Sequence, residues 1–321
     1  MGVISLVYVT VWAVVMAAFF GLAVLLTMLC VPSWRRSLAR HPRKSGALAL
    51  ICLPVVGITL WQITSSIADT IGRNFRLQHD VQVEALSLPA GTLLHLMALE
   101  PLDRNGQPQI HGLASLDTAR FPAPHTLMGA QVTSMQMDGL TSAELRLASD
   151  QVIDGWPCAA DTLMRVNFDE ATRLHPEHWQ FGACTLVGGT QIAGVTWPAD
   201  SHVENQGREY SVSHWRKPET ISIQGIELSN ATMRLDDHRK LLRWDGQLHN
   251  PMTLGEWRYP RDMRVTQNRP RTLMFTSNTS LTAQNLRTGE NLKPNVSILQ
   301  GFPGGAVRWI KPNAEIDVLD W

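Results

Sequence analysis

The stretch Trp156-Pro157-Cys158-Ala159-Ala160-Asp161-Thr162-Leu163 is one of six related phrases that decide the fold of this chain. Each phrase opens with a large apolar residue and a proline, and the six prolines are Pro89, Pro122, Pro157, Pro198, Pro260 and Pro303. They lie 33 to 62 residues apart, and the widest interval has room for a degraded copy at 225–235. Such self-similarity is typical of repeat proteins, in which each unit buries its apolar face against its neighbours.

The phrases share further residues before the proline, as in Ile153 and Gly155 ahead of Pro157. Proline has no amide proton for a strand ladder and glycine accepts a positive φ, so the Gly-to-Pro segment predicts a corner between strands. The six prolines are therefore predicted to be repeat corners, with the aromatic neighbours packed in the core.

Short stretches of alternating apolar and polar residues follow one another along the rest of the chain, at 143–148, 162–168, 210–215, 220–226, 232–235, 241–245, 271–276 and 306–310. Turn residues separate them, a pattern typical of half-buried strands. We therefore expect an all-β repeat domain over residues 87–321. A β-solenoid or stack of repeated hairpins is favoured, with a sandwich or barrel as the alternative, because periodicity does not fix closure.

The N-terminal part has a different composition, since no charged side chain occurs between Val3 and Cys30. At about 1.5 Å per residue, this stretch exceeds the ~30 Å hydrocarbon core of a bilayer. A second apolar run covers residues 47–66. Residues 1–72 are thus predicted to form a transmembrane helical hairpin with spans at about 3–30 and 47–66, joined to the β domain by a connector at 73–86. The alternative of a cleaved signal peptide is disfavoured by the length of the first run and the lack of a basic start.

Orientation follows from the loop between the two runs, which carries Arg35, Arg36, Arg40, Arg43 and Lys44. Short loops rich in Lys and Arg stay in the cytoplasm. Both termini and the β domain are therefore expected on the other side, in the periplasm of a bacterium, with the protein integral to the inner membrane.

Four cysteines are present, and only Cys158 and Cys184 lie in the predicted β domain. A single pair in an oxidising compartment predicts a disulfide, against the alternatives of two buried thiols or a cysteine nucleophile. A bonded Cys158 could not act as a nucleophile.

Signatures of the common enzyme classes are missing: there is no phosphate-binding loop, dinucleotide glycine pattern, Gly-x-Ser-x-Gly elbow or His-Glu-x-x-His sequence. Two polar clusters, His175 with His178 and Asp236-Asp237-His238, read as turns because neither has a third ligand at a metal-binding spacing. We predict no metal and no cofactor. These five residues would be the first to mutate if the protein were instead an envelope glycan or lipid hydrolase.

Eight tryptophans occur in the predicted β domain. Aromatic side chains in a row can bind sugars or lipids, but core packing explains the three that neighbour the predicted corners, Trp156, Trp197 and Trp257.

The formal net charge is zero, which argues against a nucleic-acid partner. The favoured function is therefore non-catalytic binding of an envelope protein, as an assembly factor of the envelope or of a secretion system, or as an immunity protein. A lipid-transfer component or a hydrolase is the alternative.

Overall fold

The computed structural model describes residues 57–58, 61, 64, 70–99, 112–215, 219–267 and 269–316. The chain divides into two compact units, Met1–Phe75 and Arg76–Trp321. The predicted span at 3–30 and the basic loop lie outside the described residues, as does nearly all of the span at 47–66. Among the described residues, no helix has the length and apolar character needed to cross a bilayer.

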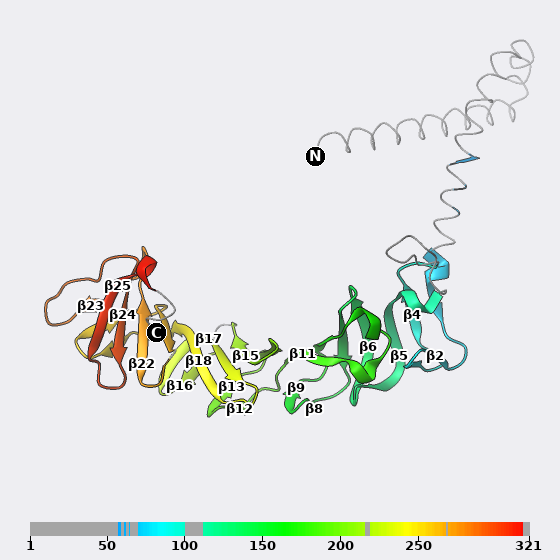
Figure 1. The fold of residues 1–321 in the computed structure, drawn as a ribbon, viewed down its shortest axis with the longest axis horizontal. Coiled ribbons are helices and arrows are strands. Elements are labelled where there is room, and N and C mark those ends of the chain that lie inside the picture. Colours follow the sequence, from blue (N-terminus) through cyan, green and yellow to red (C-terminus); the bar gives the residue numbers. More distant parts are fainter. Residues whose placement is uncertain are drawn as a thin grey trace, which may run out of the picture. The chain divides into compact units, whose positions relative to one another are not determined.

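From Asn74 onward the described part of the chain is nearly all β, as the alternating sequence predicts, and it forms a 16-stranded antiparallel sheet. Neighbouring strands follow the order of the sequence, from β4 in cyan to β25 in red (Figure 1). The strands along this path are β1 (Asn74–Arg76), β4 (Leu93–Leu96), β5 (Leu116–Leu127), β6 (Ala130–Asp138), β7 (Ser142–Leu147), β10 (Leu163–Asn167), β11 (Gln180–Thr185), β14 (His202–Asn205), β15 (Glu209–His214), β17 (Ile226–Asp236), β18 (Leu241–Leu248), β21 (Arg264–Gln267), β22 (Thr272–Thr276), β24 (Val296–Gly301) and β25 (Val307–Pro312).

Short hairpins interrupt this path at regular places. They are β2 (Val81–Val83) with β3 (Leu86–Leu88), β8 (Gln151–Ile153) with β9 (Trp156–Cys158), β12 (Thr190–Ile192) with β13 (Val195–Trp197), β16 (Ile221–Ile223) with the start of β17, and β19 (Met252–Leu254) with β20 (Trp257–Tyr259) and β23 (Gln284–Asn285). The described part of the second unit also has the 3₁₀ turns η1 (Gly112–Ser115), η2 (Glu170–Thr172), η3 (Pro176–His178) and η4 (Asn313–Glu315).

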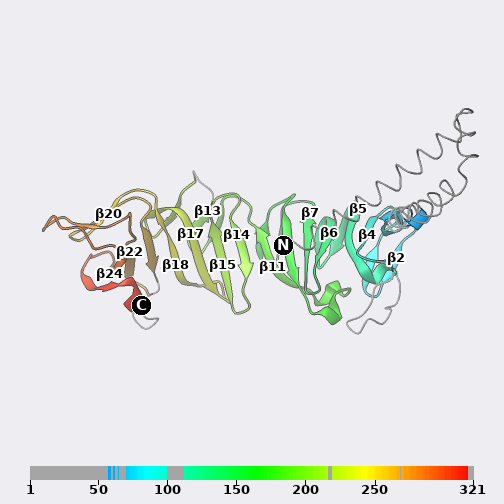
Figure 2. The same cartoon turned by 90° about the horizontal axis from the view of Figure 1, so that it is seen from above.

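A recurring unit emerges from this order: one strand of the large sheet, a short hairpin, and the next strand of the sheet. The sequences β7 to β10, β11 to β14 and β18 to β21 each follow it. Figure 2 labels the two sheet strands and one hairpin strand of the second copy, β11, β14 and β13. The first copy, β1 to β4, occupies much of the segment that we expected to be a connector, because its Val-Gln-Val and Leu-Ser-Leu stretches alternate like the later hairpins.

Burial explains why the hairpins stay with the sheet. The outer two residues of β3, β13 and β20 are buried and the middle one is exposed, so each hairpin has one apolar face. The strands of the sheet alternate in the same way, as in β7, where Ala143, Leu145 and Leu147 are all buried. The buried side chains of sheet and hairpins belong to one hydrophobic cluster. A hairpin alone is marginally stable in water, so it depends on this shared core.

Candidate binding face and the contacts of the hairpin tips

The short hairpins turn through two residues, which we call the hairpin tips. In the tips at 154–155, 193–194 and 224–225, both residues have a positive φ. This is the type I′ geometry that matches the twist of paired strands, and it favours glycine at the second position, where all three tips have one.

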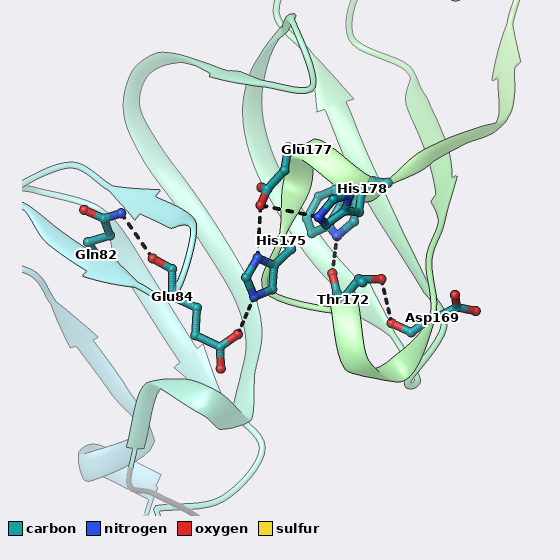
Figure 3. A network of polar contacts seen from close by, with 8 residues as sticks. Gln82, Glu84, Asp169, Thr172, His175, Glu177 and His178 are labelled. Atoms are coloured by element: carbon teal, nitrogen blue, oxygen red, sulfur yellow. Dashed lines mark hydrogen bonds and ion pairs between the residues drawn. The ribbon is translucent and has the colours of Figure 1, made fainter.

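The tip of the first hairpin lies against a loop that follows β10. Glu84 occupies this tip, and its Oε2 is 3.0 Å from Nε2 of His175 (Figure 3). The other ring nitrogen of His175, Nδ1, is 3.0 Å from Oε1 of Glu177. The hydrogen bond to Glu177 is the main reason that the pKa of His175 is raised, and the charge of Glu84 adds to it. A hydrogen bond from its own backbone and then the one from His175 lower the pKa of Glu177.

Other contacts hold the same loop, residues 168–179, on the sheet. The guanidinium of Arg173 donates to the carbonyl oxygen of Leu116 at 2.6 Å, and burial lowers its pKa. The indole of Trp179 donates to the carbonyl oxygen of Thr172 at 3.1 Å and stacks on Phe168. His175 is therefore part of a docking contact between two repeats. Within the described ranges, no three His, Cys, Asp or Glu side chains gather as metal ligands would.

The tip of the second hairpin has a different partner, the turn between β17 and β18. Arg239 of this turn donates to the carbonyl oxygens of Gly155, at 2.8 Å, and of Asp154. Its guanidinium carbon lies 4.4 Å from the centre of the Trp156 ring. The hydroxyl of Tyr210 donates to Asp154 at 3.3 Å, and burial with the charge of Asp154 raises its pKa.

The cluster Asp236-Asp237-His238 belongs to that same turn. The backbone amides of Arg239 and Lys240 donate to the carbonyl and carboxylate oxygens of Asp236 at 2.9 and 2.7 Å. The side chains of Asp237 and His238 are more than 70% exposed. The carbonyl oxygen of Asp236 thus closes a β-turn, and its carboxylate adds a second bond to the same turn, which agrees with the turn that the sequence predicts.

Cys158 and Cys184 form the expected disulfide. It joins the hairpin strand β9 to the sheet strand β11, and both residues are buried. The bond therefore fixes one hairpin to the sheet that it covers.

The six prolines occupy four kinds of position. Pro89, Pro198 and Pro260 each follow a hairpin directly and open the turn back to the sheet. Pro157 is the middle residue of β9, where it faces outward. Pro122 lies inside β5, at an irregularity in its register with β6, and Pro303 lies in the turn between β24 and β25.

Most tryptophans of the described domain are buried, namely Trp156, Trp179, Trp197, Trp244 and Trp257. Three of these, Trp156, Trp197 and Trp257, neighbour the predicted corners. Trp215 is 63% exposed and follows β15. Trp321 lies outside the described residues.

The outward face of the sheet carries a feature that the sequence analysis missed. Five residues on five adjacent strands form a line across the sheet, because each is directly opposite the next in the strand register. They are Leu93, Arg120, Ser134, Arg146 and Leu163. We call them the arginine row. Both leucines are 44% exposed, and both arginines are exposed.

A groove follows the middle of this row. Arg120, Ser134, Arg146 and Leu163 line it, together with Thr118, Thr133, Gln136 and Glu144. Serine is the smallest side chain of the row and lies between the two arginines, so it forms the floor. The register of β6 shifts between Val132 and Ser134, and such bulges re-aim side chains near functional sites.

The charges of the groove are unevenly paired. Arg146 donates to the carbonyl oxygen of Asp161 at 2.7 Å, and it forms no ion pair with a carboxylate of the described residues. The side chain of Arg120 makes no hydrogen bond or ion pair within the part of the chain that the structure describes. Glu144 is directly opposite Arg165 in the strand register, and Arg165 forms an ion pair with Glu204. The two arginines of the row are therefore available to a ligand.

Strand propensity alone could not reveal the row, because the five residues come together only through the register of four strand pairs. The two arginines are no signal in themselves, because other outward strand positions of this chain also carry arginine, as with Arg234 and Arg243. No protein-family model matches this chain, and no curated protein is significantly similar to it.

Proposed function

We propose that the protein is a non-catalytic binding protein, anchored in a bacterial inner membrane by two helices, with its β domain in the periplasm. Its role is to bind an envelope protein, as an assembly factor of the envelope or a secretion system or as an immunity protein. The arginine row is the observation that carries this proposal, because it offers exposed charge and exposed apolar surface in one groove. Arginine is enriched at protein interfaces, and the buried core of such an interface is apolar.

The placement of the polar clusters supports a role without catalysis. His175 lies between two carboxylates that dock a loop, and Asp236 closes a turn. A general base or nucleophile needs an open position beside it for a reacting atom. Neither contact has the form of such a site.

The compartment is supported by chemistry and by the sequence. Disulfides persist in oxidising compartments, and the bond between Cys158 and Cys184 is of the structural kind that joins two elements. The basic loop Arg35 to Lys44 and the apolar runs on either side of it are the basis for the predicted anchor.

Repeated hairpins in an open stack are the architecture that suits this role. The path of the large sheet begins at β1 and ends at β25, two different strands, and each unit contacts the next. Such stacks present extended surfaces to partners. A lipid-transfer role would instead need an apolar channel, whereas the inward side chains of the sheet pack against the hairpins.

The test is crosslinking in living cells, with a photoreactive residue at Ser134 of the full-length protein. Ser213 is the matched control, a serine that is also on the outward face but far along the strand order. We expect a discrete protein adduct from position 134 and little from position 213. Adducts only with lipid or glycan, at any outward position, would refute the proposal.

A further inference from the structure

The arginine row has a symmetrical pattern of leucine, arginine, serine, arginine and leucine across the strands β4, β5, β6, β7 and β10. Adjacent strands are about 4.8 Å apart, so the row is about 19 Å long between its leucines. The arginines flank the serine, each one strand away. Any group that binds over Ser134 is therefore within reach of two cations.

Two guanidinium groups around a small residue favour an anion. Arginine binds carboxylates through parallel N–H donors, and such charge-assisted bonds are about twice as strong as neutral ones. Arg120 has no competing partner within the described residues, and Arg146 uses one nitrogen for a carbonyl oxygen. Thr118 and Thr133 add hydroxyl groups to the same groove.

The exposed leucines at the two ends of the row indicate which kind of molecule carries the anionic group. Leu93 and Leu163 are each 44% exposed, on either side of the charged centre. A free phosphate or a nucleotide would leave both leucines uncovered. A protein segment with an acidic residue between two apolar residues would cover all five positions at once.

We infer that the arginine row binds a short acidic segment of a partner protein, laid across the strands with its carboxylate over Ser134 and an apolar side chain on each leucine. An extended segment advances about 3.3 Å per residue, so about six residues cover the row and the apolar residues come two or three positions from the acidic one. Glu144, which lines the same groove, disfavours a segment with acidic residues on both sides of the centre. This inference rests on the proposed binding function and adds the chemistry of the partner.

The test begins with a library of displayed random 12-residue peptides, selected on the full-length protein in lipid nanodiscs. We expect the enriched peptides to carry Asp or Glu with Leu, Ile, Val, Met or Phe two or three positions away on both sides. The best peptide, made synthetically, should lose affinity by about tenfold or more with the double variant Arg120→Glu and Arg146→Glu. The milder pair Arg120→Gln and Arg146→Gln serves if charge reversal impairs folding.

A matched control uses two other arginines that are directly opposite each other on the sheet, Arg234 on β17 and Arg243 on β18. Their double change to Glu makes the same change in net charge, and we expect it to leave the affinity within about twofold. Enrichment of basic or uncharged peptides, or equal losses in both double variants, would overturn the inference.

The crosslinking experiment separates the two proposals. A protein adduct at Ser134 whose crosslinked segment lacks an acidic residue refutes the acidic-segment inference and leaves the binding function intact. Phospholipid adducts at Ser134 without protein refute both.

Discussion

Arg239 lies over the indole ring of Trp156, with its guanidinium carbon 4.4 Å from the ring centre. The two residues belong to different repeats, since Arg239 is in the turn between β17 and β18 and Trp156 begins β9. The same guanidinium donates to two carbonyl oxygens of the hairpin tip beside Trp156. One side chain thus makes a cation–π contact and two hydrogen bonds across several strands of the sheet.

Replacing this arginine should destabilise the domain. In the variant Arg239→Ala the tip loses both donors and the cation, and we expect the free energy of unfolding to fall by about 1–3 kcal/mol. Chemical denaturation of the full-length protein in detergent, followed by tryptophan fluorescence, measures the change. Arg239→Lys should recover only part of the loss, because an ammonium cannot donate to both carbonyl oxygens in the same planar geometry.

His238→Ala provides the control for that experiment, since the neighbouring side chain is 77% exposed. Its unfolding should match that of the unmodified protein. If Arg239→Ala were equally silent, the contact with Trp156 would contribute nothing to stability.

Gly155 and Gly194 allow two effects of an added Cβ on stability to be separated, namely backbone strain and a steric clash with a neighbour. Both residues occupy the second tip position with a similar φ, +71° and +78°. A Cβ on Gly155 would come within 2.5 Å of Nη2 of Arg239, whereas a Cβ on Gly194 would have nothing within 4 Å. Gly194→Ala therefore measures backbone strain alone, about 1 kcal/mol, and Gly155→Ala should cost more because Arg239 must move.

The double variant Gly155→Ala with Arg239→Ala checks this division. We expect it to be less destabilised than the sum of the two single variants, because each change removes the same contact. Strict additivity in denaturation midpoints would contradict the placement of Arg239 against the tip.

The sequence predicted the strands better than the contacts between them. Alternation such as that of Leu145 and Leu147 predicts a strand because side chains on a strand have a period of two. The two Trp-Pro dipeptides, however, occupy different positions in their hairpins. Trp156 is the first residue of its hairpin strand and pairs with Ile153, whereas Trp197 is the last residue of its hairpin strand and pairs with Thr190. The turn sets the register, so two Trp-Pro pairs can occupy different places in the same unit.

Contacts between distant turns left no signal of this kind. Arg239 and Gly155 are 84 residues apart, and neither differs from an ordinary turn residue in the sequence. The arginine row depends in addition on a register shift in β6, which no local pattern encodes. Burial and periodicity are local properties, whereas docking and binding faces depend on the whole path of the sheet.

His175 should make the stability of the domain depend on pH. Its pKa is raised in the folded state, mainly by Glu177 and also by Glu84, and His178 is the other titratable group beside it. A raised pKa means that the stabilisation is complete below the unfolded value of 6.5 and is lost as the pH rises through the folded value. The pKa of Glu177 is lowered from 4.5 in the folded state. The stabilisation that Glu177 contributes is therefore complete above pH 4.5 and is lost as the pH falls through its lower folded pKa.

The measurement compares the unmodified protein with His175→Gln at about pH 6 and about pH 9. The difference between their denaturation midpoints should be larger at the lower pH, since glutamine keeps a hydrogen bond but cannot become charged. His249→Gln is the control, in a turn of another repeat. A difference that does not change with pH would mean that the pairs with Glu84 and Glu177 do not form in solution.

The bond between Cys158 and Cys184 gives the last prediction. It closes a segment with a sequence separation of 26, and the loss of chain entropy in the unfolded state corresponds to about 3–4 kcal/mol. Reduction should therefore lower the thermal midpoint of the unmodified protein. The double variant Cys158→Ala and Cys184→Ala should unfold at the lower temperature with or without a reducing agent, because it has no bond to break. Since both cysteines are buried, the bond should resist mild reduction until the hairpin β8–β9 opens, and a thiol reagent should leave Cys158 and Cys184 unmodified even in denaturant when no reducing agent is present. Rapid labelling of both cysteines without a reducing agent would show that they are free thiols, and it would also remove the disulfide from the argument for an oxidising compartment.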